Sequence, residues 1–227
     1  VLVITCNNHG ENINKDDAQN ADHVQLFRPL TKFSRLVAHG TAIRQAIEEA
    51  YIAAMSGNPG PAHLDFARDT IEGAAPATPS IPSRQALMDW VVQRPRPDKA
   101  LLSIAVDKIT ASRRPVLWLG NGCNRSDAGA AALRLAEALQ IPVITTFNGI
   151  GSVPTTHPNV FGALSRMGTQ LSSRVMAEAD LVLAVGNSLN AVSTGRWKMQ
   201  LPEIIQIDVD PAMLGRYFAN RTLGIIG

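Results

Sequence analysis

Residues 115–139, PVLWLGNGCNRSDAGAAALRLAEAL, predict a buried strand, a glycine turn and an alanine-rich helix. Residues 116–119 form a continuous apolar run, which is typical of a strand buried on both faces of a sheet. Gly120 and Gly122 follow that run, and glycine permits a positive φ and the close approach of a ligand to the backbone. The pattern therefore predicts a strand–turn–helix unit whose turn is a candidate phosphate site.

The start of the helix supports the same hypothesis. Ser126 or Asp127 can cap the helix, and free N–H groups at a helix start attract anions. A bound phosphate is then expected over the turn, near Ser126. The dinucleotide fingerprint has a third glycine where this chain has Arg125, so a tight turn without a ligand fits the sequence equally well.

Composition excludes several classes of function. The chain has 227 residues, is 45% hydrophobic and 18% charged, and carries a formal charge of +2. Its basic residues are scattered, which gives no electrostatic reason to expect nucleic acid as a partner. No apolar run approaches the ~20 residues of a membrane span. Cys6 and Cys123 lack metal-ligand spacing, so a reduced pair in a cytoplasmic protein is expected.

Short apolar strands alternate with helical stretches along the whole chain, which predicts an α/β fold with a parallel sheet covered by helices on both faces. Ligands of such sheets bind at the carboxyl ends of the strands. The predicted strands are residues 1–5, 62–67, 115–119, 141–146, 180–186 and 203–208, and the predicted helices are residues 41–57, capped by Thr41, 98–112, capped by Asp98, and 169–179. Trp118 and Trp197 are expected to be packing residues, and His63 a core residue.

Seven segments in this order resemble the enzymes that depend on thiamine diphosphate (ThDP), of the acetolactate synthase type. They are DDAQNADHVQLFRPLTKFSRLV (16–37), SGNPGPAHLDFARDT (56–70), the strand–turn–helix stretch (115–139), TTFNGIGSVPTTHP (145–158), LSRMGT (164–169), ADLVLAVG (179–186) and IIQIDVDPAMLGR (204–216). The resemblance implies that residues 1–71 are the C-terminal part of a pyrimidine-binding domain and residues 98–227 a central domain. The central domain is expected to have the fold shared with NAD- and FAD-binding domains of the deoxyhypusine synthase type. Residues 72–97 are rich in proline and are expected to be a linker.

The resemblance also implies site residues. Gln19 and Lys32 match residues near the substrate channel, and the nucleotide-binding candidates are Arg28, Gly120, Asn121, Gly122, Thr145 and Thr146. Asp208 follows an apolar strand and can contact a ribose hydroxyl, whereas Asp210 is expected to cap a helix that begins at Pro211. Ser188 and Val192 stand where the flavin-binding members of the family have arginines. FAD, ADP and an empty cleft therefore all remain open.

The family's ThDP and Mg²⁺ are held by a catalytic glutamate and a Gly-Asp-Gly…Asn motif, and neither is found in these 227 residues. The chain is thus interpreted as a fragment with no catalytic residue and no metal site of its own. It is expected to bind neither ThDP nor Mg²⁺ alone. The implied parent is a homodimer or homotetramer that joins 2-oxo acids. Alternatives are a decarboxylase of 2-oxo acids or of oxalyl-CoA, and a nucleotide-binding regulatory module.

Overall fold

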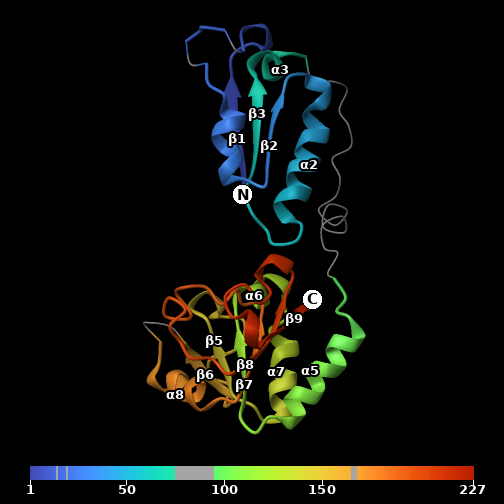
Figure 1. Ribbon diagram of the computed structural model, residues 1–227. Coiled ribbons are helices and arrows are strands. Elements are labelled where there is room, and N and C mark those ends of the chain that lie inside the picture. The colour runs from blue at the N-terminus through green and yellow to red at the C-terminus, as the bar shows by residue number, and fades with distance from the viewer. Residues whose placement is uncertain (14, 19, 75–94, 165–167) are drawn as a thin grey trace. The chain divides into compact units, whose positions relative to one another are not determined.

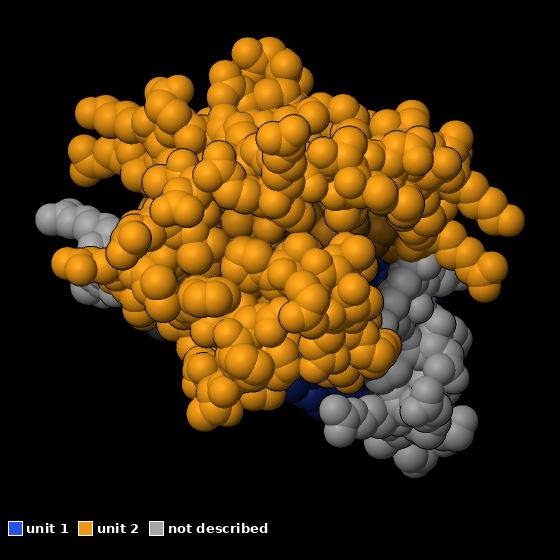
Figure 2. Space-filling view, turned by 90° about the horizontal axis from the view of Figure 1, so that it is seen from below, with its two compact units in different colours: residues 1–93 blue, residues 94–227 orange. Residues whose placement is uncertain are grey.

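The computed structural model divides the chain into two compact units, residues 1–93 and 94–227 (Figure 2). Each unit has its own sheet and is described by itself. The predicted linker, residues 72–97, falls largely outside the described residues. The structure describes residues 1–13, 15–18, 20–74, 95–164 and 168–227.

The first unit is a three-stranded parallel sheet in the order β1-β3-β2 (Figure 1). Its strands are β1 (Leu2–Asn7), β2 (Phe33–Val37) and β3 (Ala62–Ala67). The central strand, β3, is buried along its whole length, because it has a neighbour on each side. The two strands predicted in this unit are confirmed. β2 was missed, since FSRLV mixes polar and apolar residues without a continuous apolar run.

Among the described residues of this unit, the α-helices are α1 (His23–Phe27), α2 (Ile43–Met55) and α3 (Arg68–Glu72). Ala46, Ala50 and Ala54 form the buried stripe of α2, and their four-residue spacing places them on one helix face. Short 3-10 helices lie at Gly10–Asn12, Arg28–Leu30 and Gly40–Ala42. The predicted Thr41 cap is wrong, because Thr41 lies inside the last of these turns and the N-cap of α2 is Ala42, without a side-chain hydrogen bond.

The second unit is a six-stranded parallel sheet in the order β6-β5-β4-β7-β8-β9. The predicted strands at residues 115–119, 141–146 and 180–186 are β4, β5 and β7, which are adjacent and parallel, so the predicted parallel sheet is confirmed. The strands at the two edges, β6 and β9, were not predicted. The six strands are β4 (Pro115–Leu119), β5 (Val143–Thr145), β6 (Val160–Ala163), β7 (Leu181–Val185), β8 (Glu203–Asp208) and β9 (Thr222–Ile226).

Helices cover both faces of this sheet, as a parallel sheet requires (Figure 1). Alternate residues of β4 point into two separate cores. Leu117 and Leu119 pack in the core that includes α5 and α7, whereas Val116 and Trp118 pack in the core that includes α8. The helices are α5 (Lys99–Ala111), α6 (Asn121–Ser126), α7 (Gly129–Leu139) and α8 (Gln170–Glu178), with 3-10 turns at Phe147–Gly149, Pro211–Met213 and Ala219–Arg221.

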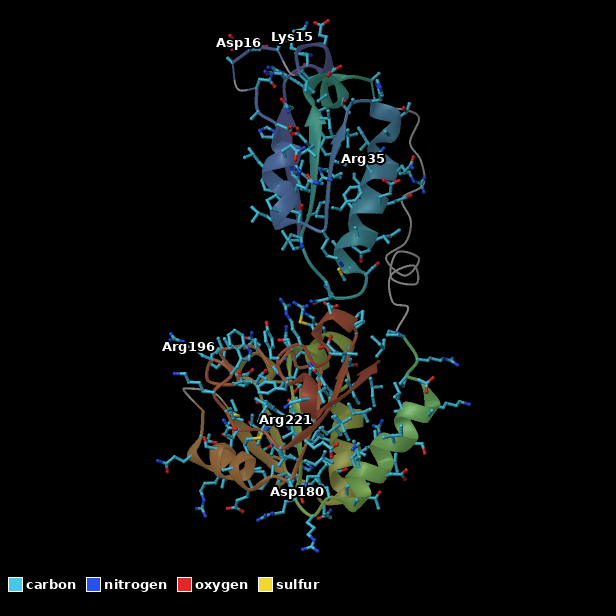
Figure 3. The ribbon with its side chains drawn as sticks, in the orientation of Figure 1. Lys15, Asp16, Arg35, Asp180, Arg196 and Arg221 are labelled. Carbon is cyan, nitrogen blue, oxygen red and sulfur yellow. The ribbon has the colours of Figure 1, made fainter. Side chains whose placement is uncertain are left out.

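Two carboxylates accept hydrogen bonds at the two ends of α5. Asp98 caps α5 as predicted, since its side chain accepts hydrogen bonds from the amides of Ala100 and Leu101. Asp180 accepts from the amide of Arg113 at 2.9 Å and from the side chain of Ser112. It therefore ties the start of β7 to the chain entering β4, at the lower end of the unit in Figure 3.

Candidate functional site

The carboxyl ends of β4, β5, β7 and β8 bring the predicted residues of the second unit together. The amide of Gly120, which follows β4, donates to Val185 O at the end of β7 at 2.9 Å. The amide of Thr146, which follows β5, donates to Leu119 O at 2.8 Å. Asp208 ends β8 one strand further along the sheet. The topology thus gathers the glycine turn, the threonine pair and the aspartate at one edge, as the sequence predicts.

The glycine turn itself differs from the prediction. Gly120 has φ −102°, and neither Gly120 nor Gly122 has a positive φ, so the conformational reason given for these glycines is wrong. They are needed for a different reason. A Cβ atom on Gly120 would lie 2.1 Å from Gly186 O, and one on Gly122 would lie 2.5 Å from the Cα of Gly186. The missing side chains make room for the backbone that leaves β7.

The amides of the turn are also largely used within the protein. Gly122 N donates to Gly186 O at 2.9 Å, and Cys123 N donates to Gly120 O at 3.1 Å. A phosphate cradle relies on N–H groups that point to the ligand. Three amides of the turn (those of Gly120, Gly122 and Cys123) instead join β4 to β7 and close the first turn of α6. This geometry favours a tight, packed turn.

The predicted cap of the following helix is wrong as well. The alanine-rich helix is α7, and its N-cap is Ala128, without a side-chain hydrogen bond. A separate short helix, α6, begins directly at Asn121, with Gly120 as its N-cap, and Ser126 is its last residue. Asp127 adopts the left-handed conformation, with φ 54°, and ends the helix. Ser126 therefore lies at the carbonyl end of α6, where that helix does not stabilise an anion, and a phosphate near Ser126 stays a prediction.

Asn121, Thr145 and Thr146 form part of the framework around the turn. The Asn121 amide, oriented to satisfy both its groups, donates to Asn148 O at 3.1 Å and accepts from Arg125 Nε at 3.3 Å. Both threonines are buried, and the Thr146 hydroxyl accepts from the amide of Gly149 at 3.0 Å. Their assignment to a nucleotide stays a prediction, beside the structural role that these contacts show.

Asp208 is the predicted ligand residue with the most distinctive environment. Its carboxylate is half-buried and accepts from the amide of Asp210 at 3.0 Å. Burial raises the pKa of Asp208 above its usual range. Asp210 caps the 3-10 turn Pro211–Met213 by accepting from the amide of Ala212, which confirms its predicted role. The two carboxylates thus have different roles, and Asp208 has acceptor capacity left for a hydroxyl group.

The segment that leaves β7 contains features that the sequence did not reveal. Asn187 is buried, and its Nδ2 has no hydrogen-bond partner among the described residues. Residues 195–197 all have positive φ, a conformation unusual for arginine and tryptophan. This turn leaves Trp197 44% exposed, with its ring centroid 4.7 Å from that of Tyr217. Trp197 thus packs against Tyr217 at the surface and not in the core, whereas Trp118 is fully buried as expected.

The predicted residues of the first unit have separate environments. Arg28 begins the 3-10 turn Arg28–Leu30, and its approach to a nucleotide stays a prediction. Lys32 Nζ donates to Ser56 O at 2.5 Å and to Asn58 O at 3.0 Å, so it binds carbonyl groups at the C-terminal end of α2. Gln19 lies outside the described residues. Sequence patterns alone did not indicate the carbonyl contacts of Lys32.

Within residues 1–13, 15–18, 20–74, 95–164 and 168–227, no group of three or more His, Cys, Asp or Glu residues is arranged to hold a metal ion. Nor does any helix in those ranges have the length and apolar character needed to cross a membrane.

Comparisons with known proteins agree with this fold and this order of motifs. Residues 102–227 match the family described as "Thiamine pyrophosphate enzyme, central domain". The chain is 34% identical over 209 residues to a probable acetolactate synthase large subunit of Methanocaldococcus jannaschii, covering 90% of this chain and 35% of that protein. It is 32% identical over 207 residues to acetolactate synthase 1, chloroplastic, of Zea mays, covering 90% of this chain and 32% of the relative. The chain thus spans about a third of the length of these relatives.

Solved structures show the same fold at lower identity. Benzoylformate decarboxylase from Polynucleobacter necessarius superposes with a TM-score of 0.80 at 22% identity, covering 100% of this chain and 42% of that one. A putative thiamin diphosphate-dependent enzyme from Mycobacterium smegmatis gives 0.77 at 24% identity, covering 100% and 43% of the two chains. Residues 102–227 match the family, and the parallel sheets and the order of the motifs agree with that match. The chain therefore belongs to the thiamine pyrophosphate enzymes.

Proposed function

We propose that this chain is part of a ThDP-dependent enzyme that joins 2-oxo acids in the manner of acetolactate synthases. The observation that carries the proposal is the 34% identity to an acetolactate synthase large subunit across 90% of the chain, which includes both units. A nucleotide-binding regulatory module would account for the second unit only. The match over the first unit therefore favours the enzyme.

The cofactors of the proposed enzyme are ThDP and Mg²⁺. Mg²⁺ prefers carboxylate and phosphate oxygens. The described residues contain no cluster of three or more His, Cys, Asp or Glu residues that could hold a metal ion, so no Mg²⁺ ligand is assigned among them. We therefore give no residue of this chain a role in a chemical step on ThDP.

The residues of the second unit also do not fit a flavin. Ser188 and Val192 are uncharged where arginines would meet the pyrophosphate, and Val192 is 68% exposed. The amide of Gly122 is already donated to Gly186 O. Each charge-assisted hydrogen bond lost would cost about 1.5–3 kcal/mol of binding. We therefore expect purified protein without flavin absorbance, and a stoichiometric flavin spectrum would show that these substitutions are compensated.

The proposed assembly is a homodimer or homotetramer. Strand β1 lies at the edge of its sheet and leaves Leu2 and Ile4 exposed, the latter by 58%. Exposed apolar side chains on a sheet edge favour association. Sedimentation velocity at several protein concentrations tests the assembly, and a single monomeric species throughout would contradict it.

The test of the proposed activity is the formation of acetolactate from pyruvate by the polypeptide at the length that its gene encodes. Acetolactate that depends on added ThDP and Mg²⁺ supports the proposal. An aldehyde as the sole product, from pyruvate or benzoylformate, would indicate a decarboxylase instead. Failure to consume any 2-oxo acid would overturn both assignments.

A matched variant separates the two roles open to Lys32. Lys32→Met removes the ammonium group and keeps most of the apolar stem. If Lys32 only binds the carbonyls of Ser56 and Asn58, the variant lowers the melting temperature and leaves the KM for pyruvate unchanged. A raised KM at unchanged stability would place Lys32 in the substrate channel.

A further inference from the structure

A buried polar cluster lies on one face of the first sheet, opposite the apolar core against α2. His63 and Asp65 alternate along β3 with Ala62, Leu64 and Phe66, which pack in that apolar core. His63 and Asp65 therefore share the other face, where α1 contacts β3. We call the following residues the Asp65 cluster: Thr5 and Asn7 of β1, His23 of α1, Ser34 of β2, and His63 and Asp65 of β3.

Asp65 is the centre of this cluster, because three side chains converge on its carboxylate. Thr5 Oγ1 donates to Oδ1 at 2.7 Å, and Asn7 Nδ2 donates to Oδ2 at 2.8 Å. His23 Nδ1 lies 3.0 Å from Oδ1. Asp65 is only 1% exposed, so these donors replace the water that a buried carboxylate loses.

Two of the three donors stand at the two ends of one loop. Asn7 is the last residue of β1 and His23 is the first residue of α1, so residues 8–22 connect them. Asn7 Nδ2 also donates to Ala21 O at 3.0 Å, near the far end of the loop. The single carboxylate of Asp65 thus holds both ends of the loop against the central strand.

This loop leaves the carboxyl end of β1, the edge at which ligands of parallel sheets bind. Figure 3 shows Lys15 and Asp16 of the loop beyond that end of the strands. Asn8 Nδ2 donates to Ala18 O at 2.9 Å, and this hydrogen bond joins the two sides of the loop. Gln19, the predicted substrate-facing residue, belongs to the same loop in the sequence.

The remaining members of the cluster, His63 and Ser34, are linked to Asp65 by hydrogen bonds through Thr5. His63 is fully buried, with its ring stacked on Phe27 at a centroid distance of 4.1 Å. Its Nε2 lies 2.9 Å from Thr5 Oγ1, and its Nδ1 lies 2.8 Å from Ser34 Oγ. Since Thr5 donates its proton to Asp65, its oxygen accepts from His63 Nε2–H. Thr5 and His63 therefore orient the carboxylate without touching the loop.

We propose that Asp65 is a positioning residue that fixes the described part of this loop, residues 8–13, 15–18 and 20–22, at the carboxyl edge of the first sheet through Asn7 and His23. Its catalytic consequence rests on the proposed function, in which the loop faces a 2-oxo acid. The positioning itself does not rest on that function. The two parts can therefore be tested separately.

The first test is amide hydrogen exchange of the full chain carrying Asp65→Asn. Hydrogen bonds to a charged acceptor are strong, so their loss should speed exchange within residues 8–22 by about tenfold to a hundredfold. Amides of β3 and α2 should change much less. An equal acceleration in the loop, β3 and α2 would mean a general loss of stability and would overturn the proposal.

Two further variants keep this test decisive. Asn7→Ala removes one loop contact and leaves the carboxylate in place, so it serves if Asp65→Asn does not fold, and the same selective acceleration is expected. Thr5→Val is the matched control, since it removes a hydrogen bond to Asp65 that does not involve the loop. Selective loop exchange in Thr5→Val equal to that in Asn7→Ala would contradict the role of the loop contacts.

The second test uses the ThDP-dependent activity. Asp65→Asn should raise the KM for the 2-oxo acid by about tenfold, which is the low end of the effect expected when a hydrogen bond to a charged group is lost. The apparent affinity for ThDP should stay unchanged. Unchanged KM with accelerated loop exchange would overturn the catalytic consequence alone. If the parent protein consumes no 2-oxo acid, the proposed function fails and the exchange experiment still decides the positioning role.

Discussion

Replacing Gly120 by alanine tests whether the turn after β4 is packed against the protein or open to a ligand. An added Cβ would lie 2.1 Å from Gly186 O and 2.6 Å from the Cα of Asn187, and both contacts are with backbone. Backbone atoms cannot rotate away as the end of a long side chain can. The turn and the segment leaving β7 must therefore move apart.

The magnitude follows from what this movement disrupts. Overpacking of a rigid site costs about 1–3 kcal/mol. The hydrogen bonds from Gly120 N to Val185 O and from Gly122 N to Gly186 O, both 2.9 Å long, must stretch. Each contributes about 0.5–1.5 kcal/mol to the free energy of unfolding. Gly120→Ala should thus destabilise the second unit by about 2–6 kcal/mol, which lowers its melting temperature by roughly 8 °C or more for a unit of this size.

Thermal unfolding followed by circular dichroism and by tryptophan fluorescence measures this change, since Trp118 is buried in the second unit. Gly40→Ala is the control. A Cβ there would meet only Thr70 O, at 3.8 Å, so the melting temperature should stay close to that of the parent. A Gly120→Ala protein that melts within about 2 °C of the parent and loses affinity for ADP would refute the packing argument, because destabilisation of about 2 kcal/mol or more requires a larger shift.

Three further predictions concern single side chains. Asp98→Ala should lower the free energy of unfolding of the second unit by about 1 kcal/mol in urea titrations, because α5 loses its N-cap, while Asp98→Asn should retain most of it. Burial lowers the pKa of His63 below 6.5, so protonation favours the unfolded chain. The stability of the first unit should be complete above pH 6.5 and decline as the pH falls toward the folded-state pKa, and His63→Gln should flatten that slope in melts across this range. Burial raises the pKa of Asp208, so the stability of the second unit falls as the pH rises from the unfolded-state pKa through the folded-state pKa. Asp208→Asn should therefore raise the melting temperature at pH 7 but not below about pH 4, and an equal effect at both pH values would exclude a charge-based cause.

The sequence by itself determined the fold class and the elements with continuous periodicity. Residues 115–119 and 181–185 are apolar without interruption, and such runs are stable only when a sheet buries both their faces. The strand ends that carry Gly120, Thr146 and Asp208 could be placed at one edge, because all strands of a parallel sheet end on the same side. The caps at Asp98 and Asp210 were predictable, since each depends only on neighbouring residues.

Only the tertiary structure decided what the site residues contact. Gly120 and Gly122 exclude a side chain because Gly186, more than sixty positions later in the chain, passes against them. Asp65 gathers partners from β1 and α1, and no local pattern marks Asp65 as their meeting point. Periodicity and capping are properties of consecutive residues, and the sequence displays them directly. A contact between distant segments depends on how the strands are ordered and how closely their backbones approach, and this is settled only when the chain has folded.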